Sequence, residues 1–280
     1  MAGKVKKSSG KTNKVKRLPP HDPDLLSVIV PAYNCKTIAR DLTTIEDHLT
    51  RLSQPYEIIC VVDGRKILKD RTREKAKKVV SKTIKVYFYP KNKGKGYAIR
   101  FGMARAKGGT IAFIDSGNDL SASGIGMALA HMKWYNADII IGSKRHKASR
   151  VHYPWQRRIL SFFVQRATLY LFGLNVSDTQ TGLKVFRREV LVKVLPRLLV
   201  KRWAIDLEIL SVANRLGFKR IYESPVEINH NFMSNIGPSA VRNFVIDYLA
   251  ILYRTYILHY YDEQNHDLWS SDKKLRLKYR

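Results

Sequence analysis

The sequence has little cysteine and little acid, and it lacks long apolar runs. Only two of its 280 residues are cysteines, Cys35 and Cys60, which excludes a disulfide framework and a zinc site built from paired cysteines. Both lie in or beside apolar runs, so we expect buried free thiols. No uncharged stretch reaches about 18 residues, so no transmembrane helix is predicted. The basic N-terminus is not followed by the apolar segment of a signal peptide.

Acidic residues are outnumbered more than two to one. The chain has 23 Asp and Glu against 51 Lys and Arg, a formal net charge of +28. The first 17 residues hold seven of the bases and no acid, so most of the excess lies in the rest of the chain. Such a field attracts nucleic acid, acidic lipid or phosphorylated substrates. No signature of a specific nucleic-acid-binding fold is present, which favours the other two partners.

The order of apolar runs predicts the fold class. Strand-like runs rich in Val and Ile alternate with helical stretches, which indicates an α/β fold: a mostly parallel sheet with helices on both faces. The expected strands are Leu26–Val30, Glu57–Val62, Ile84–Tyr89, Thr110–Ile114 and Asp138–Ile141, with later ones near Leu183–Phe186, Lys219–Tyr222 and Val226–Asn229. The expected helices are Thr37–Leu52, Asp70–Ser81, Lys95–Lys107, Ser121–Tyr135, Trp155–Phe172, Arg188–Leu199, Ala204–Leu216 and Ser239–Tyr261.

Composition divides the chain into four segments. Residues 1–24 are rich in Lys, Ser and Pro and are predicted to be a disordered basic tail. One domain is expected over 25–235, an amphipathic helix over 236–262 and a polar, basic tail over 263–280. The helix follows Gly237-Pro238, with Ser239 as its expected cap. The apolar residues near helical spacing in it are Phe244, Tyr248, Ile251, Leu252, Tyr256 and Tyr260.

Polar side chains follow several of the expected strands. Ligands of parallel sheets bind at the carboxyl ends of the strands, so Tyr33, Asp63 and Asp115 are expected at one rim. A carboxylate at Asp63 accepts hydrogen bonds from a base or a ribose, although an Asp before Gly is also a common turn. The glycines of Gly94-Lys95-Gly96 allow close backbone approach, and the helix start behind them favours phosphate oxygens.

Six segments taken together resemble one known family. They are SVIVPAYN (27–34), EIICVVDG (57–64), NKGKGYAIRFGM (92–103), IAFIDSGND (111–119), DTQTGLKVFRR (178–188) and WAIDLEIL (203–210). Their order resembles the family 2 glycosyltransferases, and within them the synthases that load a sugar onto a polyprenyl (dolichyl-type) phosphate. The resemblance covers roughly Leu26 to Asn229. It implies a GT-A-type Rossmann-like fold and an inverting transfer of a hexose from GDP-mannose or UDP-glucose to a polyprenyl phosphate.

The resemblance also implies roles for individual residues. Asp206 and Glu208 are alternative acids near the sugar or the acceptor; two apart on a helix, only one of them is expected to face the site. The residues implied for the donor are Pro31, Tyr33, Asn34, Asp63, Lys95, Asp115 and Arg187. Those implied for the acceptor are Lys144, Arg157, Ser161, Asp178 and Gln180. The catalytic role is assigned to Asp115, Asp206 and Arg157.

Asp115 occupies the place where the family keeps a D-x-D pair that holds Mg²⁺ or Mn²⁺ on the donor diphosphate. The position of the second Asp is Gly117 here, and the next acid is Asp119. Three alternatives remain open. Asp119 replaces the missing ligand, giving a site of Asp115 and Asp119; Asp115 binds the metal with fewer protein ligands; or activity is lost or depends only weakly on metal.

A polyprenyl acceptor requires contact with a membrane. We expect a cytoplasmic protein that binds the membrane surface peripherally, through the Ser239–Tyr261 helix and the Trp155–Phe172 helix, aided by the N-terminal bases. A separate membrane-spanning partner and packing of both helices on the sheet are the alternatives. The competing functions are a family 2 enzyme acting on a glycan, lipid or protein hydroxyl, a catalytically silent relative, and a polyanion-binding protein.

Overall fold

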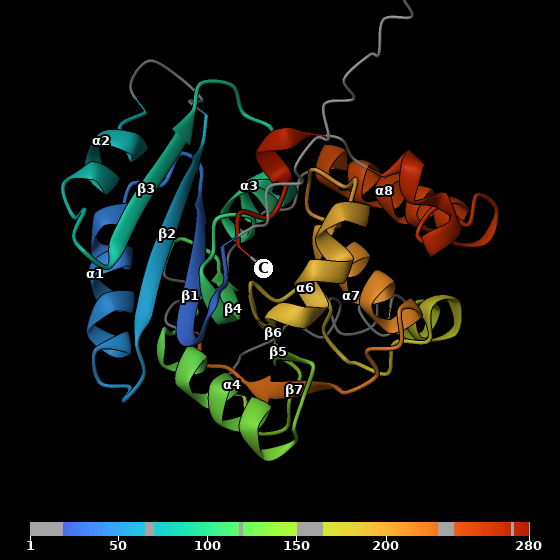
Figure 1. Ribbon diagram of the computed structural model, residues 1–280, viewed down its shortest axis with the longest axis horizontal. Helices are drawn as coiled ribbons and strands as arrows, with labels where there is room; N and C mark the ends of the chain where they lie inside the picture. Colours follow the sequence, from blue (N-terminus) through green and yellow to red (C-terminus); the bar gives the residue numbers. More distant parts are fainter. Residues whose placement is uncertain are drawn as a thin grey trace, which may run out of the picture.

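A computed structural model of the chain describes residues 19–64, 70–117, 120–149, 165–228, 238–269 and 272–279. Its centre is one seven-stranded sheet with helices on both faces (Figure 1). The strands are β1 (Asp22–Ala32), β2 (Tyr56–Asp63), β3 (Ile84–Tyr89), β4 (Gly108–Ile114), β5 (Ile139–Ser143), β6 (Leu183–Arg187) and β7 (Ile221–Pro225). The α-helices are α1 (Ile38–Leu49), α2 (Thr72–Lys77), α3 (Lys95–Met103), α4 (Ser123–Trp134), α6 (Arg188–Val194), α7 (Ile205–Arg215) and α8 (Pro238–Tyr256). Short 3₁₀ helices are η1 (Leu195–Arg197), η2 (Glu263–Leu268) and η3 (Lys273–Leu275).

The sheet order is β3-β2-β1-β4-β6-β5-β7, and every strand except β6 runs in one direction. The carboxyl ends of six strands therefore meet the amino end of β6 at one edge. The order reverses between β1 and β4, because β2 and β3 lie on one side of β1 and the later strands on the other. Crevices at such a reversal are where open α/β sheets bind ligands. The prediction of a mostly parallel α/β sheet is confirmed.

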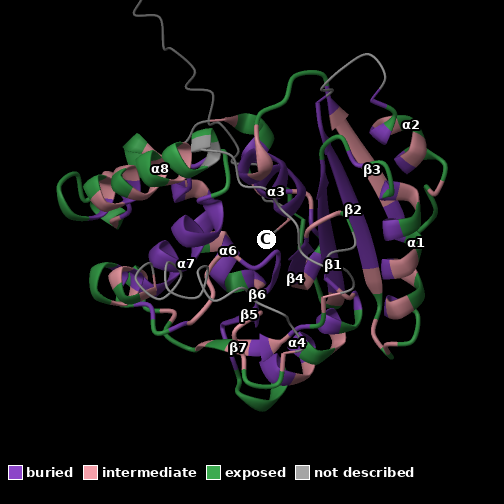
Figure 2. Ribbon diagram, turned by 180° about the vertical axis from the view of Figure 1, so that it is seen from behind, coloured by how far each residue is buried: buried purple, intermediate pink, exposed green. Residues whose placement is uncertain are grey.

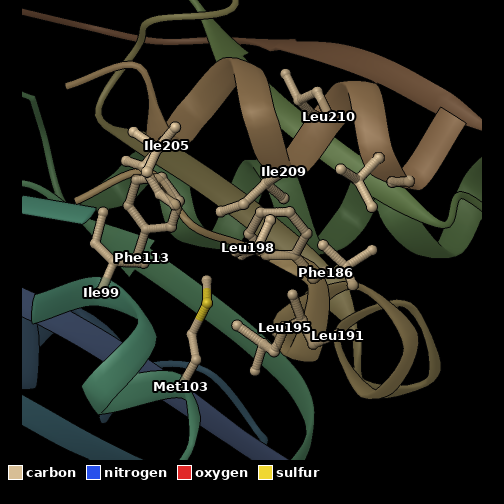
Figure 3. Packing of buried hydrophobic residues seen from close by; sticks show 14 of the residues in the cluster. Ile99, Met103, Phe113, Phe186, Leu191, Leu195, Leu198, Ile205, Ile209 and Leu210 are labelled. Atoms are coloured by element: carbon tan, nitrogen blue, oxygen red, sulfur yellow. The ribbon is translucent and has the colours of Figure 1, made fainter. Parts of the chain in front are cut away.

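Alternation along the strands divides the core into two layers. Val28 and Val30 pack with α1, α2 and α4, whereas Ile29 between them packs with α3 on the opposite face. Figure 2 shows β1 and β2 buried in the interior and exposed residues on the outer sides of α1 and α2, whereas α3 is buried along most of its length. In the second layer the rings of Phe113 and Phe186 stack with centroids 6.1 Å apart. Figure 3 shows α3, α6 and α7 packing around them. This layer therefore holds α3 and α7 in place against the sheet.

Several predicted boundaries were wrong. Strand β1 begins at Asp22, inside the expected tail, because the Asp22 amide donates to the Lys107 carbonyl and pairs the strand with β4. Of the expected strand Val226–Asn229, the described residues 226–228 add no strand to the sheet: Ile228 forms an isolated bridge to Leu120, and Asn229 lies outside the described residues. Of the expected Trp155–Phe172 helix, residues 165–172 are helical, and the rest lies outside the described residues.

The C-terminal helix also differs from expectation. Helix α8 begins at Pro238, so Ser239 lies inside the helix and is not its cap, and the helix ends at Tyr256. The face that carries Phe244, Tyr248 and Ile251 packs on the core. A polar tail was expected beyond the helix, but Lys278 donates its amide to the Ala104 carbonyl and Leu275 is buried. The described part of the tail is thus attached to the α3 side of the domain.

Glu208 of α7 organises this side of the molecule. Its buried carboxylate accepts the amide hydrogens of Leu199 and Val200 and the hydroxyl hydrogen of Tyr261, 2.8 Å away. The Arg254 guanidinium of α8 lies 3.3 Å from it. Burial raises the pKa of Glu208, while these donors act in the opposite direction. The residue therefore joins α7, α8, the C-terminal segment and the loop before α7, and its role is structural.

Replacing Glu208 with Ala should destabilise the fold strongly. The change leaves two amides, a hydroxyl and the Arg254 charge without their buried acceptor, at a cost of about 3–5 kcal/mol in the free energy of unfolding. Urea denaturation measures it. The exposed Glu189→Ala is the control, with an expected change below about 0.5 kcal/mol. Equal effects of the two substitutions would contradict the structural role.

Candidate active site at the carboxyl edge of the sheet

Asp115 follows the last residue of β4, and its amide donates to the Gly182 carbonyl at 2.8 Å. Its Oδ2 lies 2.8 Å from the Nζ of Lys95, the first residue of α3. The Lys95 side chain is 11% exposed and that of Asp115 is 30% exposed, so solvent reaches the pair mainly on the Asp115 side. Burial alone would lower the pKa of Lys95, but Asp115 and Asp206 outweigh it and raise this pKa. Lys95 is therefore a fixed cation.

A second carboxylate and a second lysine continue this pair inward. Asp206, in the first turn of α7, lies 3.5 Å from Lys95 through Oδ2 and 2.5 Å from Lys184 through Oδ1. Lys184 of β6 has no exposed surface, and it also donates to the Thr181 carbonyl at 2.8 Å. Burial lowers the pKa of Lys184, against the attraction of Asp206. Asp115, Lys95, Asp206 and Lys184 thus form an alternating row of charges, called the charge row below.

The glycines of the Gly94-Lys95-Gly96 turn allow packing against the protein's own chain. A Cβ on Gly94, whose φ is +95°, would lie 2.3 Å from the Lys201 carbonyl oxygen. One on Gly96 would lie 2.8 Å from the Val200 carbonyl oxygen and 2.9 Å from the Ile205 Cβ. The two glycines therefore let the start of α3 lie against the loop before α7. That approach brings Lys95 to Asp206.

The backbone amides at and just before the start of α3 were expected to be free to bind phosphate. Most of them donate hydrogen bonds within the protein instead. Asp63, at the end of β2, is 2% exposed and accepts the amide hydrogens of Lys93 and Gly94 at 2.7 and 2.9 Å. It also accepts from the Asn92 side chain at 2.9 Å, and the Tyr97 amide donates to the Lys201 carbonyl. The Asp63 carboxylate thus holds the turn that carries Lys95. Nucleoside binding by Asp63 stays a prediction.

The turn after β1 lies beside this site. Pro31 is buried within β1 and pairs with Val61 of β2, beyond the last residue that β1 pairs with β4. Its missing N–H therefore leaves no gap in the sheet. Tyr33 follows with 43% of its surface exposed, and Asn34 adopts a positive φ of 48°. Of the three residues predicted for the donor base, Tyr33 and Asn34 reach solvent at the rim.

The Asp178–Gly182 turn closes the other side of the site at the amino end of β6. Asp178 accepts the amide hydrogen of Gln180 at 3.2 Å, that of Lys144 at 3.3 Å and the Thr181 hydroxyl hydrogen. Glu223 of β7 accepts the Asp178 amide at 3.0 Å, which fixes the turn on the sheet. The predicted acceptor residues Lys144, Asp178 and Gln180 are therefore neighbours, partly buried and at the same edge as Asp115.

This edge offers cations and carboxylates that are positioned before any ligand binds. Trp203 adds an aromatic surface: its ring centre lies 5.2 Å from the Lys95 Nζ, and 58% of the residue is exposed. The charged side chains at this edge can bind a phosphate, and the Trp203 ring can contact the apolar face of another ring. The arrangement suits a phosphorylated, sugar-bearing ligand.

Comparison with known proteins decides the family. Residues 27–195 match the family described as Glycosyl transferase family 2. The chain belongs to glycosyltransferase family 2. Dolichyl-phosphate beta-glucosyltransferase ALG5A of Trichomonas vaginalis is 30% identical to this glycosyltransferase over 239 residues, 81% of this chain and 72% of the relative. The Drosophila melanogaster dolichyl-phosphate beta-glucosyltransferase is 31% identical over 214 residues, 68% and 63% of the two chains.

Solved structures of low sequence identity share the fold. Mannosyl-3-phosphoglycerate synthase from Rubrobacter xylanophilus matches this glycosyltransferase with a TM-score of 0.62 at 15% identity, over 86% of this chain and 76% of that one. Glucosyl-3-phosphoglycerate synthase from Mycobacterium tuberculosis, crystallised with Mn²⁺, UDP and glucosyl-3-phosphoglycerate, matches with a TM-score of 0.57 at 18% identity, over 82% and 79%. The predicted GT-A-type fold is confirmed.

Arg187 does not reach the edge of the sheet where the candidate site lies. Strand β6 is antiparallel to β4, so Arg187 pairs with Thr110 at the start of β4, whereas Leu183 pairs with Ile114 next to Asp115. Its guanidinium donates to the Ala137 carbonyl at 2.7 Å. The donor role of Arg187 was therefore wrong. Neighbouring Arg188 is buried and donates to carbonyls, Gly108 among them.

Three predicted residues, Arg157, Ser161 and Asp119, lie outside the described part of this glycosyltransferase. Within the described part, no group of three His, Cys, Asp or Glu side chains could hold a metal ion. Gly117, at the place of the second Asp, donates its amide to Asp41 of α1 at 2.9 Å. Among the described residues, the carboxylates of Asp115 and Asp206 flank the Lys95 ammonium, and these residues alone do not complete a metal site of three such ligands. Metal binding through Asp119 stays a prediction.

Sequence reasoning missed Lys184, the innermost member of the charge row. A lone lysine inside the apolar run Leu183–Phe186 was the available signal, because a buried lysine is almost always paired. Asp41 was missed as well. Its Oδ2 accepts from Gly117, from Thr37 at 3.0 Å and from Cys35 at 3.4 Å, and it holds the backbone just after Asp115.

Substituting Gly96 with Ala should separate α3 from the loop before α7. The new Cβ meets a backbone carbonyl and the Ile205 Cβ, neither of which is a flexible chain end, so the free energy of unfolding should fall by about 1–3 kcal/mol. Thermal unfolding measures the change. Gly126→Ala in α4 is the matched control: its Cβ meets only the tip of Leu52 at 3.3 Å, and the helix should gain up to about 1 kcal/mol. A Gly96 variant as stable as the control would contradict the packing role.

Proposed function

We propose that this family 2 glycosyltransferase transfers glucose from UDP-glucose to dolichyl phosphate at the carboxyl edge of its sheet. The observation that carries the proposal is its roughly 30% identity, over most of its length, to dolichyl-phosphate beta-glucosyltransferases from several eukaryotes. UDP as the donor nucleotide is supported only by fold-level neighbours, which were crystallised with UDP or UDP-glucose. GDP-mannose, which the sequence alone left open, has no support from the dolichyl-phosphate relatives, which are glucosyltransferases.

The proposed transfer is a single displacement at the anomeric carbon. An oxygen of the acceptor phosphate forms a bond to C1 of glucose while the bond from C1 to the β-phosphate oxygen breaks. The electron pair leaves with UDP, so the products are UDP and dolichyl phosphate glucose, with the configuration at C1 inverted. A phosphate monoester has a second pKa of about 6 and is mostly dianionic at neutral pH, so the attack needs no strong general base. Catalysis then consists of positioning and charge stabilisation.

We assign positioning and charge stabilisation to the described residues according to where each one lies at the carboxyl edge. Lys95 and Asp115 lie between the β1 turn and the Asp178 turn, where the diphosphate of the donor would meet the acceptor phosphate. Asp206, which lies between two lysines, is proposed as a positioning residue for Lys95. Lys144 and Gln180 line the acceptor side. Arg157 and Ser161 are proposed for the acceptor phosphate from the sequence resemblance alone.

The acceptor lipid requires contact with a bilayer, and α8 offers a surface for it. Besides its core-facing side, α8 has a second apolar row that is about half exposed: Val241, Val245, Leu249, Tyr253 and Tyr256. Residues 165–172 lie next to it, since the Phe172 and Tyr248 rings are 5.3 Å apart, and Tyr170 there is 79% exposed. None of the described helices is long and apolar enough to cross a membrane. We infer peripheral binding through this row, assisted by the basic charge of the chain.

The decisive assay incubates the full chain with a short polyprenyl phosphate and UDP-glucose, GDP-mannose or UDP-N-acetylglucosamine, followed by mass spectrometry of the lipid. We expect a hexose-phosphate-lipid product with UDP-glucose. Arg157→Ala should reduce transfer and leave UDP binding unchanged, because Arg157 is assigned to the acceptor phosphate and its transfer step, and not to the nucleotide. Product with GDP-mannose alone would refute the donor assignment. Transfer to polyprenyl phosphate that survives in Arg157→Ala would refute the acceptor role of Arg157. UDP binding without product from any donor would favour a hydroxyl acceptor or a silent relative.

Membrane binding is tested by flotation with vesicles of phosphatidylcholine, with and without phosphatidylserine. Val245→Glu combined with Leu249→Glu should reduce the bound fraction at least about tenfold, since each burial of such a side chain contributes about 1.5–3 kcal/mol. Val80→Glu is the control, because Val80 is equally exposed (54%) but lies beyond α2. Absence of wild-type binding to both vesicle types would remove α8 as the membrane surface.

A further inference from the structure

A surface cavity of about 610 Å³ lies at the opposite edge of the sheet from the candidate active site. Gly109 and Thr110, at the start of β4, form part of its wall, whereas Asp115 follows the last residue of that strand. At about 3.3 Å per residue, roughly 17 Å of strand separate Thr110 from Asp115. Ligand pockets have volumes of roughly 300–1,000 Å³, so this cavity can hold a small molecule that does not touch the charge row.

Lysine and arginine outnumber acids among the described residues that line this cavity. The cations are Lys133 near the end of α4, Arg187, and Arg188 and Lys193 of α6, and the acid is Glu189. In the described part of the chain, both arginines donate only to carbonyl and amide oxygens, so neither has a carboxylate as a hydrogen-bond partner. Oxygens of that kind do not neutralise a positive charge. The excess of cations therefore makes the cavity attractive to an anion.

Arg187 is fixed in position before a ligand binds. Its Nε donates to the Ala137 carbonyl at 2.7 Å, and its Nη2 donates to the Asn136 side-chain oxygen at 2.5 Å. Both acceptors lie in the turn between α4 and β5. A guanidinium has five N–H groups, so these two bonds leave three for a ligand. A fixed guanidinium fork matches the geometry of two phosphate oxygens.

Apolar side chains complete the wall of the cavity. Leu129 and Met132 of α4 are buried, and Val192 of α6 is half-buried. The cavity thus combines fixed positive charge with an apolar surface. A ligand that fits both parts carries an anionic group joined to an apolar group.

We propose that this cavity is a second ligand site, which binds a small organic phosphate from solution. The phosphate contacts Arg187 and Lys133, and the apolar part of the ligand lies against Met132. A phosphate monoester is mostly dianionic at neutral pH, so it interacts more strongly with several cations than a carboxylate does. The exposed Lys133 and Lys193 give the cavity a charged rim, which favours a ligand from water over a lipid. The inference is independent of the proposed function, because it uses none of the residues assigned to transfer.

Nuclear magnetic resonance of the full chain, with ¹³C in the methionine methyl groups, tests the proposal at the cavity itself. Titration with phenyl phosphate should move the Met132 signal until it saturates, with a Kd of about 1 mM or lower. The signal of Met103, which is buried in the other core layer, should not move. Benzoate keeps the ring but carries one charge, and inorganic phosphate lacks the ring. Each should bind at least about threefold more weakly than phenyl phosphate.

Two variants remove cations from the cavity. Arg187→Gln should weaken the binding of phenyl phosphate at least about tenfold, as expected for loss of a charged hydrogen bond. Lys133→Gln changes an exposed side chain that the fold does not need, and it should weaken binding at least about threefold. Lys82→Gln is the matched control, because this exposed lysine does not line the cavity and its loss should leave binding unchanged.

Several results would overturn the inference. One is a Met132 signal that does not move up to about 10 mM phenyl phosphate. Others are binding of benzoate or of inorganic phosphate as tight as that of phenyl phosphate, and unchanged binding in both cavity variants. If Arg187→Gln does not fold, as circular dichroism would show, Lys133→Gln still decides. Flotation with vesicles that contain phosphatidic acid tests a lipid as the source of the phosphate. Weaker flotation of Lys133→Gln than of Lys82→Gln would overturn the assignment to a ligand from solution.

Discussion

The contact of Lys95 with two carboxylates is the constraint around which this edge of the molecule is arranged. Asp115 comes from β4 and Asp206 from α7, and an ammonium can lie between them only if α3 begins against the loop before α7. A side chain at Gly94 would prevent that approach. Burying a lysine requires such pairing, because a desolvated charge without partners costs several kcal/mol. The local backbone is therefore a consequence of one buried charge.

Two further acids, neither of them placed on the reacting atoms, hold this arrangement from opposite sides. Asp63 orients the turn before α3 by accepting its amides. Glu208 does the same for the loop before α7, through Leu199 and Val200. Asp206 and Glu208 are two residues apart on one helix and point in different directions, as their spacing predicted. One serves the site and the other supports the fold that carries it.

Local patterns predicted the sheet and most of its edge, whereas long-range pairing decided the rest. The apolar runs before Asp63 and Asp115 were sufficient to place both residues at the carboxyl edge. Arg187 was misplaced because its position depends on the direction of β6, and no local feature of the run reveals an antiparallel strand. The sequence also could not predict which apolar row of α8 packs on the core, because the helix is apolar on both sides. The partner of the Gly94 turn is distant in sequence and could not be read from the turn.

The charge row has a consequence for how phosphorylated substrates reach the site. Asp115, Lys95, Asp206 and Lys184 carry two charges of each sign, so the row adds no net attraction for a phosphate. Attraction must then come from the other bases of a chain whose net charge is +28. A field of that kind acts over several ångströms and concentrates polyanions near the surface. For the transfer proposed above, a neutral, rigid centre inside a basic surface separates two tasks: the field attracts the donor and acceptor phosphates despite their mutual repulsion, and the site aligns them.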